Sequence, residues 1–334
     1  MIYSYLIMRH PAVEYTLNSF DKVKIIKVKY GFLSILYLPL HVLSALIKDN
    51  KASFNFQYAN YRYIFAIIIL IILKKNYSVS LWGSDYYKCH GVRKKIIEII
   101  LQNANRVSIA SRDSKRFLKK KFELVDAEVI PFLIPNLETI AQECNSNFNL
   151  DKAKKKRILC GTNGSSNQQF DLIVESLNNA KDKLANNYII VFHLSYGLDK
   201  ETKLIVDNFV NTTSIECEVV YEYFQGKALA DFRGSIDILI QIQKTDQLSA
   251  AMLEHLVQNK LAITGDWLPY DDLNDIGVKY KTISKNNIVS ELSSVLMCLD
   301  DFTISEFMAK NKEKIINNYG NSVLTKKWYE FLCG

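Results

Sequence analysis

The stretch QIQKTDQLSAAMLEHLVQNKLAITGDWLPY, residues 241–270, decides the fold of this chain. Its apolar spacing predicts two strands with a polar loop and a helix between them, the strands over 236–243 and 261–264 and the helix over 247–259. Asp246 lies in the loop and Glu254 on the helix, with seven residues between them. Carboxylates placed in this way can face one cleft, where they accept hydrogen bonds from the hydroxyl groups of a ligand.

The same alternation of strands and helices runs through most of the chain. Strands are predicted at 25–30, 77–82, 106–110, 127–134, 157–160, 187–197 and 215–223, whereas 52–59 is ambiguous. Helices are predicted at 31–47, 61–75, 92–104, 111–122 (with Ser111 as its cap), 168–185, 200–211, 226–234, 286–299, 303–317 and 321–332. Strands that alternate with helices of this length form parallel sheets with helices on both faces.

The length of 334 residues favours two domains rather than one. The segment 136–156 is polar and weakly patterned, and we interpret it as the linker. The predicted fold is therefore α/β, with two Rossmann-like domains, parallel sheets and a cleft between the domains. The domain boundaries are 1–140 for the first domain, 156–318 for the second, and 319–334 for a C-terminal helix.

The net charge of +7 is concentrated in the first half of the chain. Residues 1–150 hold 21 Lys and Arg against 11 Asp and Glu, a net charge of +10, and the remaining 21 and 24 give −3. A basic half can meet anionic lipid, and the candidate residues are Lys94, Lys95, Lys115, Arg116, Lys119, Lys120 and Lys121. A solvated, lysine-rich surface is the alternative. Nucleic acid ranks last among the possible partners and is not expected, because neither a helix-turn-helix pattern nor an RNA-binding aromatic signature is present.

Two features of composition bear on the compartment. The six cysteines are scattered without C-x-x-C spacing, which indicates reduced thiols in the cytoplasm, and no secretory signal is visible. The apolar runs 31–47 and 64–73 are shorter than the roughly 20 residues that span a bilayer. We therefore expect buried or interface-lying helices and a cytoplasmic protein attached peripherally to the inner membrane.

Candidate ligand-binding residues follow the strands of the second half, because ligands of parallel sheets bind beyond the carboxyl ends of the strands. The loop after 157–160 has small residues whose amides can approach a phosphate, although an ordinary turn is the alternative. Lys244 can neutralise a leaving diphosphate, and Phe224 can stack on a base or pack in the core. The donor-binding candidates are Gly161, Asn163, Gly164, Ser165, Asn167, His193, Ser195, Tyr196, Phe224, Lys244, Gln247, Ser249 and Glu254.

In the first half, the segment after the strand 77–82 contributes a second set of candidates. Asp85 could take the proton from an attacking hydroxyl group, or it could cap the following turn. Gly83 permits a tight turn. The acceptor-binding candidates are Trp82, Gly83, Tyr86 and His90.

These residues resemble a bacterial glycosyltransferase of the two-domain GT-B architecture. The segment from Asp246 to Glu254, followed by HLVQNKLAITGDW, resembles the acid–seven residues–Glu motif of these enzymes, with Asp in place of the commoner Glu and Asn259-Lys260 in place of Gly. LWGSDYYK (81–88), GTNGSSNQQFDLI (161–173), HLSYG (193–197) and the Gln247 region resemble the family that transfers 4-acetamido-4,6-dideoxygalactose during assembly of enterobacterial common antigen, with Gln168-Gln169 where that family tends to have His.

The resemblance implies transfer of a sugar from a nucleotide-sugar to a glycan or lipid-linked acceptor in surface polysaccharide assembly. It implies that the second domain holds the nucleotide, the first holds the acceptor, and the C-terminal helix crosses back to the first domain. It also implies a metal-independent reaction without a cofactor. Asp85 and Asp246 are the catalytic candidates.

Other classes of function remain open at this point: a sugar-nucleotide epimerase or phosphotransferase with the same fold, and a non-catalytic nucleotide-sugar-binding module. Turnover of the donor without an acceptor would favour the first, and tight binding without turnover the second. Glu254→Ala is expected to abolish nucleotide binding with the fold intact.

Overall fold

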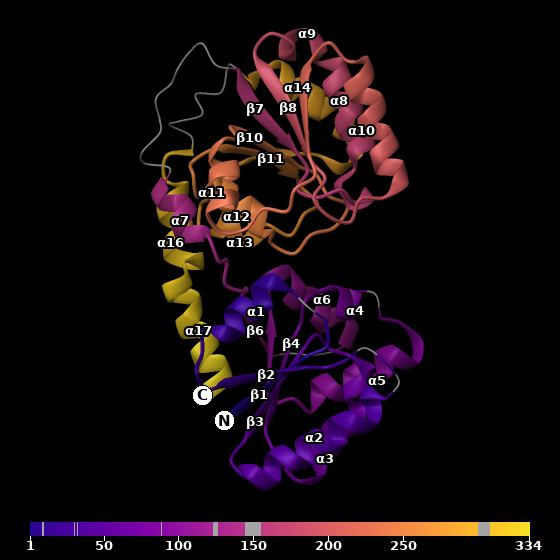
Figure 1. The fold of residues 1–334 in the computed structure, drawn as a ribbon, viewed down its shortest axis with the longest axis vertical. Helices are drawn as coiled ribbons and strands as arrows, with labels where there is room; N and C mark the ends of the chain where they lie inside the picture. Colours follow the sequence, from indigo (N-terminus) through magenta and orange to yellow (C-terminus); the bar gives the residue numbers. More distant parts are fainter. Residues whose placement is uncertain are drawn as a thin grey trace. The chain divides into compact units, whose positions relative to one another are not determined.

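The computed structural model describes residues 1–8, 10–29, 31, 33–87, 89–122, 126–143, 155–299 and 308–334. They divide into two compact units, Met1–Pro135 with Tyr319–Gly334, and Asn136–Asn318. Each unit contains one six-stranded sheet whose neighbouring strands are all parallel (Figure 1). The repeated alternation of strand and helix in the sequence produces this architecture, because a parallel connection needs a crossover segment.

The sheet of the first unit has the strand order β2-β1-β3-β4-β5-β6. Its strands are β1 (Ile2–Leu6), β2 (Val23–Lys27), β3 (Ser53–Gln57), β4 (Tyr77–Ser80), β5 (Arg106–Ile109) and β6 (Ala127–Val129). The helical segments of this unit are α1 (Pro11–Asn18), α2 (Ser34–Lys48), η1 (Tyr61–Tyr63), α3 (Ile64–Ile72), α4 (Ser84–Tyr87), α5 (Gly91–Gln102), α6 (Arg112–Phe122) and α17 (Asn321–Cys333).

The first strand is the main element that the sequence pattern did not predict. β1 lies between β2 and β3, so it is a central strand, and every one of its residues is buried. A strand buried on both faces shows no polar alternation. The helix α1 begins at Pro11 and no glycine-rich turn precedes it. The glycine-rich loop that commonly marks the end of a first strand is therefore missing from the sequence as well. The ambiguous segment 52–59 contains β3, and Ser111 accepts a hydrogen bond from the Ser114 amide as the predicted cap of α6.

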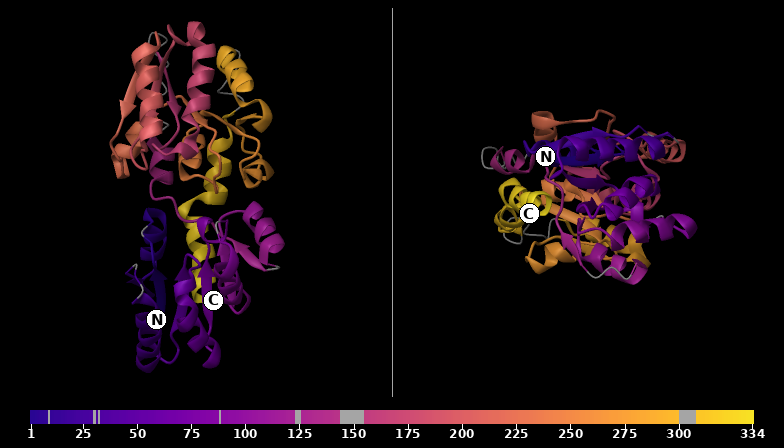
Figure 2. Two further views of the ribbon diagram at one scale, coloured as in Figure 1. Left: turned by 90° about the vertical axis from the view of Figure 1, so that its right-hand side faces the viewer. Right: turned by 90° about the horizontal axis from the view of Figure 1, so that it is seen from below.

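The two faces of this sheet bury different kinds of side chain. One face presents aromatic rings such as Tyr5, Phe54 and Phe56 to the helices α2, α3 and α5. The other face packs on α1 and on α17, the yellow C-terminal helix in Figure 2, whose Trp328 is fully buried and donates a hydrogen bond to the Pro131 carbonyl at 2.8 Å. The last helix is therefore part of the core of the first unit.

The sheet of the second unit has the order β12-β11-β10-β7-β8-β9. Its strands are β7 (Lys156–Cys160), β8 (Tyr188–His193), β9 (Glu216–Val220), β10 (Ile238–Gln241), β11 (Leu261–Gly265) and β12 (Lys281–Ile283), the last of which was not predicted. Its helical segments are α7 (Leu137–Glu143), η2 (Ser166–Gln168), α8 (Phe170–Asn179), α9 (Lys181–Leu184), α10 (Lys200–Thr212), α11 (Gly226–Gly234), α12 (Ala250–Leu256), α13 (Asp271–Asp275), η3 (Lys285–Asn287), α14 (Ile288–Met297) and α16 (Asn311–Tyr319). The start of the helix predicted at 303–317 lies outside the described residues.

The predicted linker 136–156 is wrong in its first part, because α7 occupies residues 137–143. Leu137, Ile140 and Ala141 are buried, and α7 packs on α11 and α12 of the second unit. Three apolar residues on one face are enough to dock a helix of two turns, although they are too few to give a clear periodic signal.

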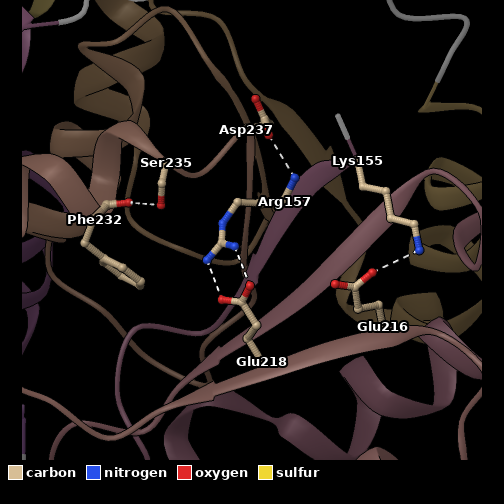
Figure 3. Close-up of polar contacts among 7 residues, drawn as sticks. All are labelled: Lys155, Arg157, Glu216, Glu218, Phe232, Ser235 and Asp237. Atoms are coloured by element: carbon tan, nitrogen blue, oxygen red, sulfur yellow. Dashed lines mark hydrogen bonds and ion pairs between the residues drawn. The ribbon is translucent and has the colours of Figure 1, made fainter. Parts of the chain in front are cut away.

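Charged side chains join the strands of the second sheet near their amino-terminal ends (Figure 3). Arg157 of β7 makes a two-point ion pair with Glu218 of β9, at 2.5 and 2.6 Å, and the Arg157 amide donates to Asp237 at 2.8 Å. Lys155 pairs with Glu216 beside them at 3.0 Å. Because these groups are engaged with each other, we assign this edge a structural role and look for the functional site at the opposite edge.

Candidate functional site

The carboxyl ends of β7 and β10 meet at the point where the strand order of the second sheet reverses. Two loops leave the sheet there, 161–169 and 242–249, and they are joined by hydrogen bonds. The Asn167 side chain donates to the Thr245 carbonyl at 3.0 Å and accepts from the Thr245 amide at 3.2 Å, while the Lys244 amide donates to the Asn167 carbonyl at 2.8 Å. In open parallel sheets, ligands bind at such a reversal point.

The backbone is strained in both of these loops. Gln169 and Leu248 adopt the left-handed conformation, with φ of 59° and 58°, although neither is a glycine. Gly161 has φ of 70°, and a Cβ atom there would lie 2.8 Å from the Phe170 ring. Such conformations cost about 1–3 kcal/mol each and gather at functional sites. The strain therefore marks the same edge as the topology does.

The backbone amides of the loop 161–169 are largely paired within the protein, which argues against the predicted phosphate cradle. The Gly161 amide donates to the Ile240 carbonyl, the Gly164 amide to the Tyr196 carbonyl, and the Ser165 amide to the Asn163 side chain. Asp199, which the sequence reasoning missed, accepts from the Ser166 amide and caps α10 through the Thr202 amide. These bonds connect the loop after β7 firmly to the loop after β8.

His193 ends β8 and leaves a polar atom unused. Its Nε2 lies 2.9 Å from the Glu222 carbonyl and must donate to it. Burial lowers the pKa of His193, so the ring is neutral and its Nδ1 is an acceptor. Within the described residues, neither this buried Nδ1 nor the buried Oγ of Ser195 has a hydrogen-bond partner. A buried polar atom without a partner needs an explanation, and contact with a ligand is one, so the end of β8 is a candidate for ligand binding.

The aromatic rings that are exposed at this edge are tyrosines rather than Phe224. Phe224 is half-buried against the rings of His193 and Phe232, at centroid distances of 5.9 and 5.0 Å, so it packs rather than stacking on a base. Tyr196 and Tyr223 are instead exposed, by 56% and 51%, and contact each other edge to face at 5.9 Å. The segment Tyr223-Phe224-Gln225 was expected to supply a stacking ring, and Phe224 was chosen because the sequence does not show which of the two neighbouring rings is exposed.

Asp246 is hydrogen-bonded on several sides. It accepts from Gln241 Nε2 at 3.0 Å, from the Gln247 amide at 2.7 Å and from the Tyr270 hydroxyl. Burial raises the pKa of Asp246, and these hydrogen bonds oppose the rise. These hydrogen bonds show that the carboxylate orders the loop. The catalytic role of Asp246 stays a prediction. Lys244 is exposed beside it, and Ser249 immediately precedes α12.

Glu254 of α12 forms a buried ion pair with Arg233 of α11. The Arg233 Nε lies 3.1 Å from Glu254 Oε2, and the two side chains are only 5% and 7% exposed. Arg233 Nη1 is buried without a partner among the described residues. The predicted contact of Glu254 with a ligand stays a prediction, but one of its oxygens is already engaged within the protein.

In the first unit, Asp85 joins the loops that follow β3 and β4. Its carboxylate accepts hydrogen bonds from the amides of Ala59, Trp82 and Gly83, at 2.7–3.2 Å, and the residue is 3% exposed. Burial raises the pKa of Asp85 to about 6, against the lowering effect of these amides. At neutral pH the group is mostly ionised, and its hydrogen bonds hold the two loops together. The general-base role of Asp85 stays a prediction.

The other predicted acceptor-binding residues fall in different environments. Gly83 adopts φ of 115°, as its predicted turn requires, and Tyr86 is completely buried in the core, so it cannot meet an acceptor. His90 is exposed immediately before α5.

Trp82 lies among aromatic residues at the carboxyl edge of the first sheet. It donates from Nε1 to the buried Gln57 side chain at 3.1 Å and contacts the rings of His10, Tyr58 and Phe132 at centroid distances of 5.4, 5.5 and 6.2 Å. These four residues follow different strands, and Tyr58 has a left-handed backbone with φ of 69°. Partly exposed rings of this kind are suited to the apolar faces of sugars.

A metal centre is not evident in the part of the chain that the structure describes, because no three His, Cys, Asp or Glu side chains there could hold an ion together. None of the helices within that part has the length and apolar character needed to cross a membrane.

The chain matches solved structures in fold but matches no known sequence family. No known family description and no curated sequence matches the chain. A glycosyltransferase structure from Rickettsia africae ESF-5 matches it with a TM-score of 0.72 at 12% identity, covering 100% of this chain and 98% of its own. Sucrose-phosphate synthase from Thermosynechococcus elongatus matches with 0.72 at 10% identity, covering 98% and 97%. Anabaena HepE in complex with UDP and glucose matches with 0.71 at 10% identity, covering 98% of both chains.

Likeness at this level of identity establishes the fold and not the substrate. The matches extend over at least 98% of this chain, so they include both of its units and both of its sheets. The chain has the two-unit α/β fold of the GT-B glycosyltransferases.

Proposed function

We propose that this chain is a glycosyltransferase that moves a sugar from a nucleotide-sugar to a glycan or lipid-linked acceptor. The observation that carries the proposal is the pair of strained, mutually bonded loops at the strand reversal of the second sheet. Unsatisfied polar atoms of His193 and Ser195 follow the neighbouring strand. A solved structure of the same fold, Anabaena HepE, holds UDP and glucose.

In this proposal the second unit binds the donor. Lys244 is exposed on the loop 242–249 and supplies a positive charge for the diphosphate as it leaves. Tyr196 and Tyr223 offer exposed rings for the base, and His193 Nδ1 accepts a hydrogen bond from a donor hydroxyl group. Since Lys244 supplies the positive charge that stabilises the leaving diphosphate, we expect the reaction to need no divalent metal.

The first unit binds the acceptor in this proposal, and the rings around Trp82 supply a stacking surface for a sugar. The resemblance to transferases of enterobacterial common antigen favours a lipid-linked glycan and a role in surface polysaccharide assembly at the cytoplasmic face of the inner membrane.

Nucleotide binding is the direct test of the donor site. UDP, GDP and dTDP should be screened by thermal shift, and we expect one diphosphate to raise the melting temperature, since saturation at a hundredfold excess over Kd stabilises by about 2.7 kcal/mol. Lys244→Ala should weaken that diphosphate roughly tenfold while leaving the corresponding nucleoside unaffected, because only the charge on the phosphates is lost.

Lys181→Ala, which removes an exposed lysine from the short helix α9, is the matched control and should bind like the unaltered protein. Equal weakening by both substitutions would indicate a nonspecific charge effect and count against the site. Donor turnover without any acceptor would favour an epimerase or phosphotransferase, and tight binding without turnover would favour a binding module.

Metal independence has its own test. Treatment with a chelator is expected to leave both nucleotide affinity and donor turnover unchanged, because Lys244 rather than a cation would neutralise the diphosphate. Nucleotide affinity and release of the nucleotide from the donor are measured before and after chelation. Loss of turnover that added Mg²⁺ or Mn²⁺ restores would contradict the proposal.

A further inference from the structure

The helices α2 and α3 are apolar on their outer surfaces as well as on their inner ones. On α2, Leu38, Val42 and Ala45 face the core, whereas Leu36, Leu40 and Ile47 are exposed by 60%, 67% and 86%. α3 lies against α2 and repeats the pattern. A helix that is apolar all round belongs in a protein core or in a membrane.

α2 and α3 lie side by side on one side of the first sheet (Figure 1). Their inner side chains pack in one cluster with the aromatic residues of the sheet, so their outer side chains share one surface. We call it the α2–α3 outer face. It holds eleven of the 22 large apolar residues that are exposed in the described part of the chain: Leu33, Leu36, Tyr37, Leu40, Leu43, Ile47, Phe65, Ile68, Ile71, Ile72 and Leu73. Exposed apolar patches of this extent mark interaction sites.

The charges around this face are of one sign. Residues 31–48 and 61–75 contain no Asp or Glu. Lysines stand at its ends: Lys24, Lys48, Lys51, Lys74 and Lys75. Burial, and after it the charges of Lys24 and Lys48, lowers the pKa of His41 on α2. The neighbouring Asp49 is paired with the N-terminal amine at 3.0 Å. An apolar surface with a rim of cations is complementary to a bilayer that contains anionic lipids.

The rim also decides between a bilayer and a second copy of the chain. Two copies that met through this face would bring the same lysines together, because a two-fold interface pairs a patch with itself. The 15 residues of α2 measure about 22 Å, shorter than the roughly 30 Å of a hydrocarbon core, so the helix can lie along the surface but cannot cross it.

We propose that the α2–α3 outer face seats on an anionic lipid bilayer. Its Leu, Ile and Phe side chains enter the boundary between headgroups and acyl chains, and the rim lysines contact lipid phosphates. This differs from attraction by the charges of the basic helices α5 and α6 alone, because apolar side chains supply part of the binding. The attachment does not depend on sugar transfer, although it would bring the first unit to a lipid-linked acceptor.

Co-sedimentation with vesicles tests the proposal on the full chain. Vesicles of phosphatidylcholine and phosphatidylglycerol in equal parts are expected to bind the protein, and part of the binding should survive high salt because apolar contacts are not screened. The double variant Leu40→Asp/Ile72→Asp should bind about a hundredfold more weakly, since each buried aliphatic side chain contributes about tenfold. Leu204→Asp on α10, at an equally exposed leucine, is the matched control and should bind normally.

The alternative occupants give different results. Failure of the unaltered protein to sediment with these vesicles overturns the proposal, and so does binding that vanishes completely at high salt. A concentration-dependent dimer that Leu40→Asp/Ile72→Asp makes monomeric, without vesicle binding, would assign the face to a second copy instead. Because nucleotide binding is measured without vesicles, its success or failure is independent of these outcomes.

Discussion

Glu254→Ala is expected to lower the free energy of unfolding by about 3–5 kcal/mol, because it leaves the buried Arg233 guanidinium without its counter-charge. The expectation from sequence alone, loss of nucleotide binding in an intact fold, has to be revised for this reason. Equilibrium unfolding in urea measures the change, with the second unit followed through a probe such as Trp267.

Two further variants make this prediction specific. Arg233→Met/Glu254→Leu removes both charges together and should recover most of the lost stability. Asp231→Ala breaks the ion pair with Lys227 on the same helix α11, where both side chains are more than half exposed, and should change stability by no more than about 0.5 kcal/mol. A Glu254→Ala protein as stable as the unaltered chain would show that the ion pair is not formed.

The ion pair also decides how the ligand role of Glu254 should be tested. Glu254→Gln keeps the shape of the side chain and an oxygen that can accept from Arg233 Nε, so it disturbs the fold less than alanine does. Nucleotide affinity in this variant reports on the predicted contact of Glu254 with a ligand, with a smaller contribution from unfolding.

Asp85→Ala is expected to destabilise the first unit by at least about 3 kcal/mol. The amides of Ala59, Trp82 and Gly83 lose their acceptor in a buried place, and each unsatisfied donor costs about 1–3 kcal/mol. Asp85→Asn should fall between alanine and the unaltered protein, since it retains one acceptor oxygen. Thermal and urea unfolding measure the change.

The neighbouring Ser84 provides the control for Asp85. Ser84 is exposed, and Ser84→Ala should shift stability by less than about 0.5 kcal/mol. An Asp85→Ala protein that keeps its full stability and nucleotide binding but loses sugar transfer would restore the general-base role that the sequence suggested.

The sequence predicted the architecture better than it predicted the site. Alternating strands and helices were enough to give two parallel sheets, because their period and length are local properties. β1 was missed since a strand buried on both faces shows no alternation, and α7 was missed since it is short. The loops after β7, β8 and β10 were chosen as candidates for ligand binding from the general rule that ligands of parallel sheets bind beyond the carboxyl ends of the strands.

The roles of individual residues were harder to predict because they depend on partners far along the chain. Glu254 meets Arg233, 21 residues earlier on another helix, and Asp85 meets Ala59, 26 residues earlier on another loop. Nothing in the spacing of Asp246 indicates that Gln241 and Tyr270 would both donate to it. A carboxylate in a motif can serve a ligand or the fold, and only tertiary contacts separate the two.

The core of the first unit needs the last helix, α17, which is synthesised at the end of the chain. Trp328, Phe331 and Leu332 complete the apolar cluster that covers Val13 and Leu17, yet a ribosome delivers them some 300 residues after β1. Until the last helix is synthesised, the apolar residues of α1 lack part of their covering. The second unit is continuous from 136 to 318 and can fold before that helix is available. The apolar flank of the first unit is therefore complete only after the sequence of the second unit has been synthesised.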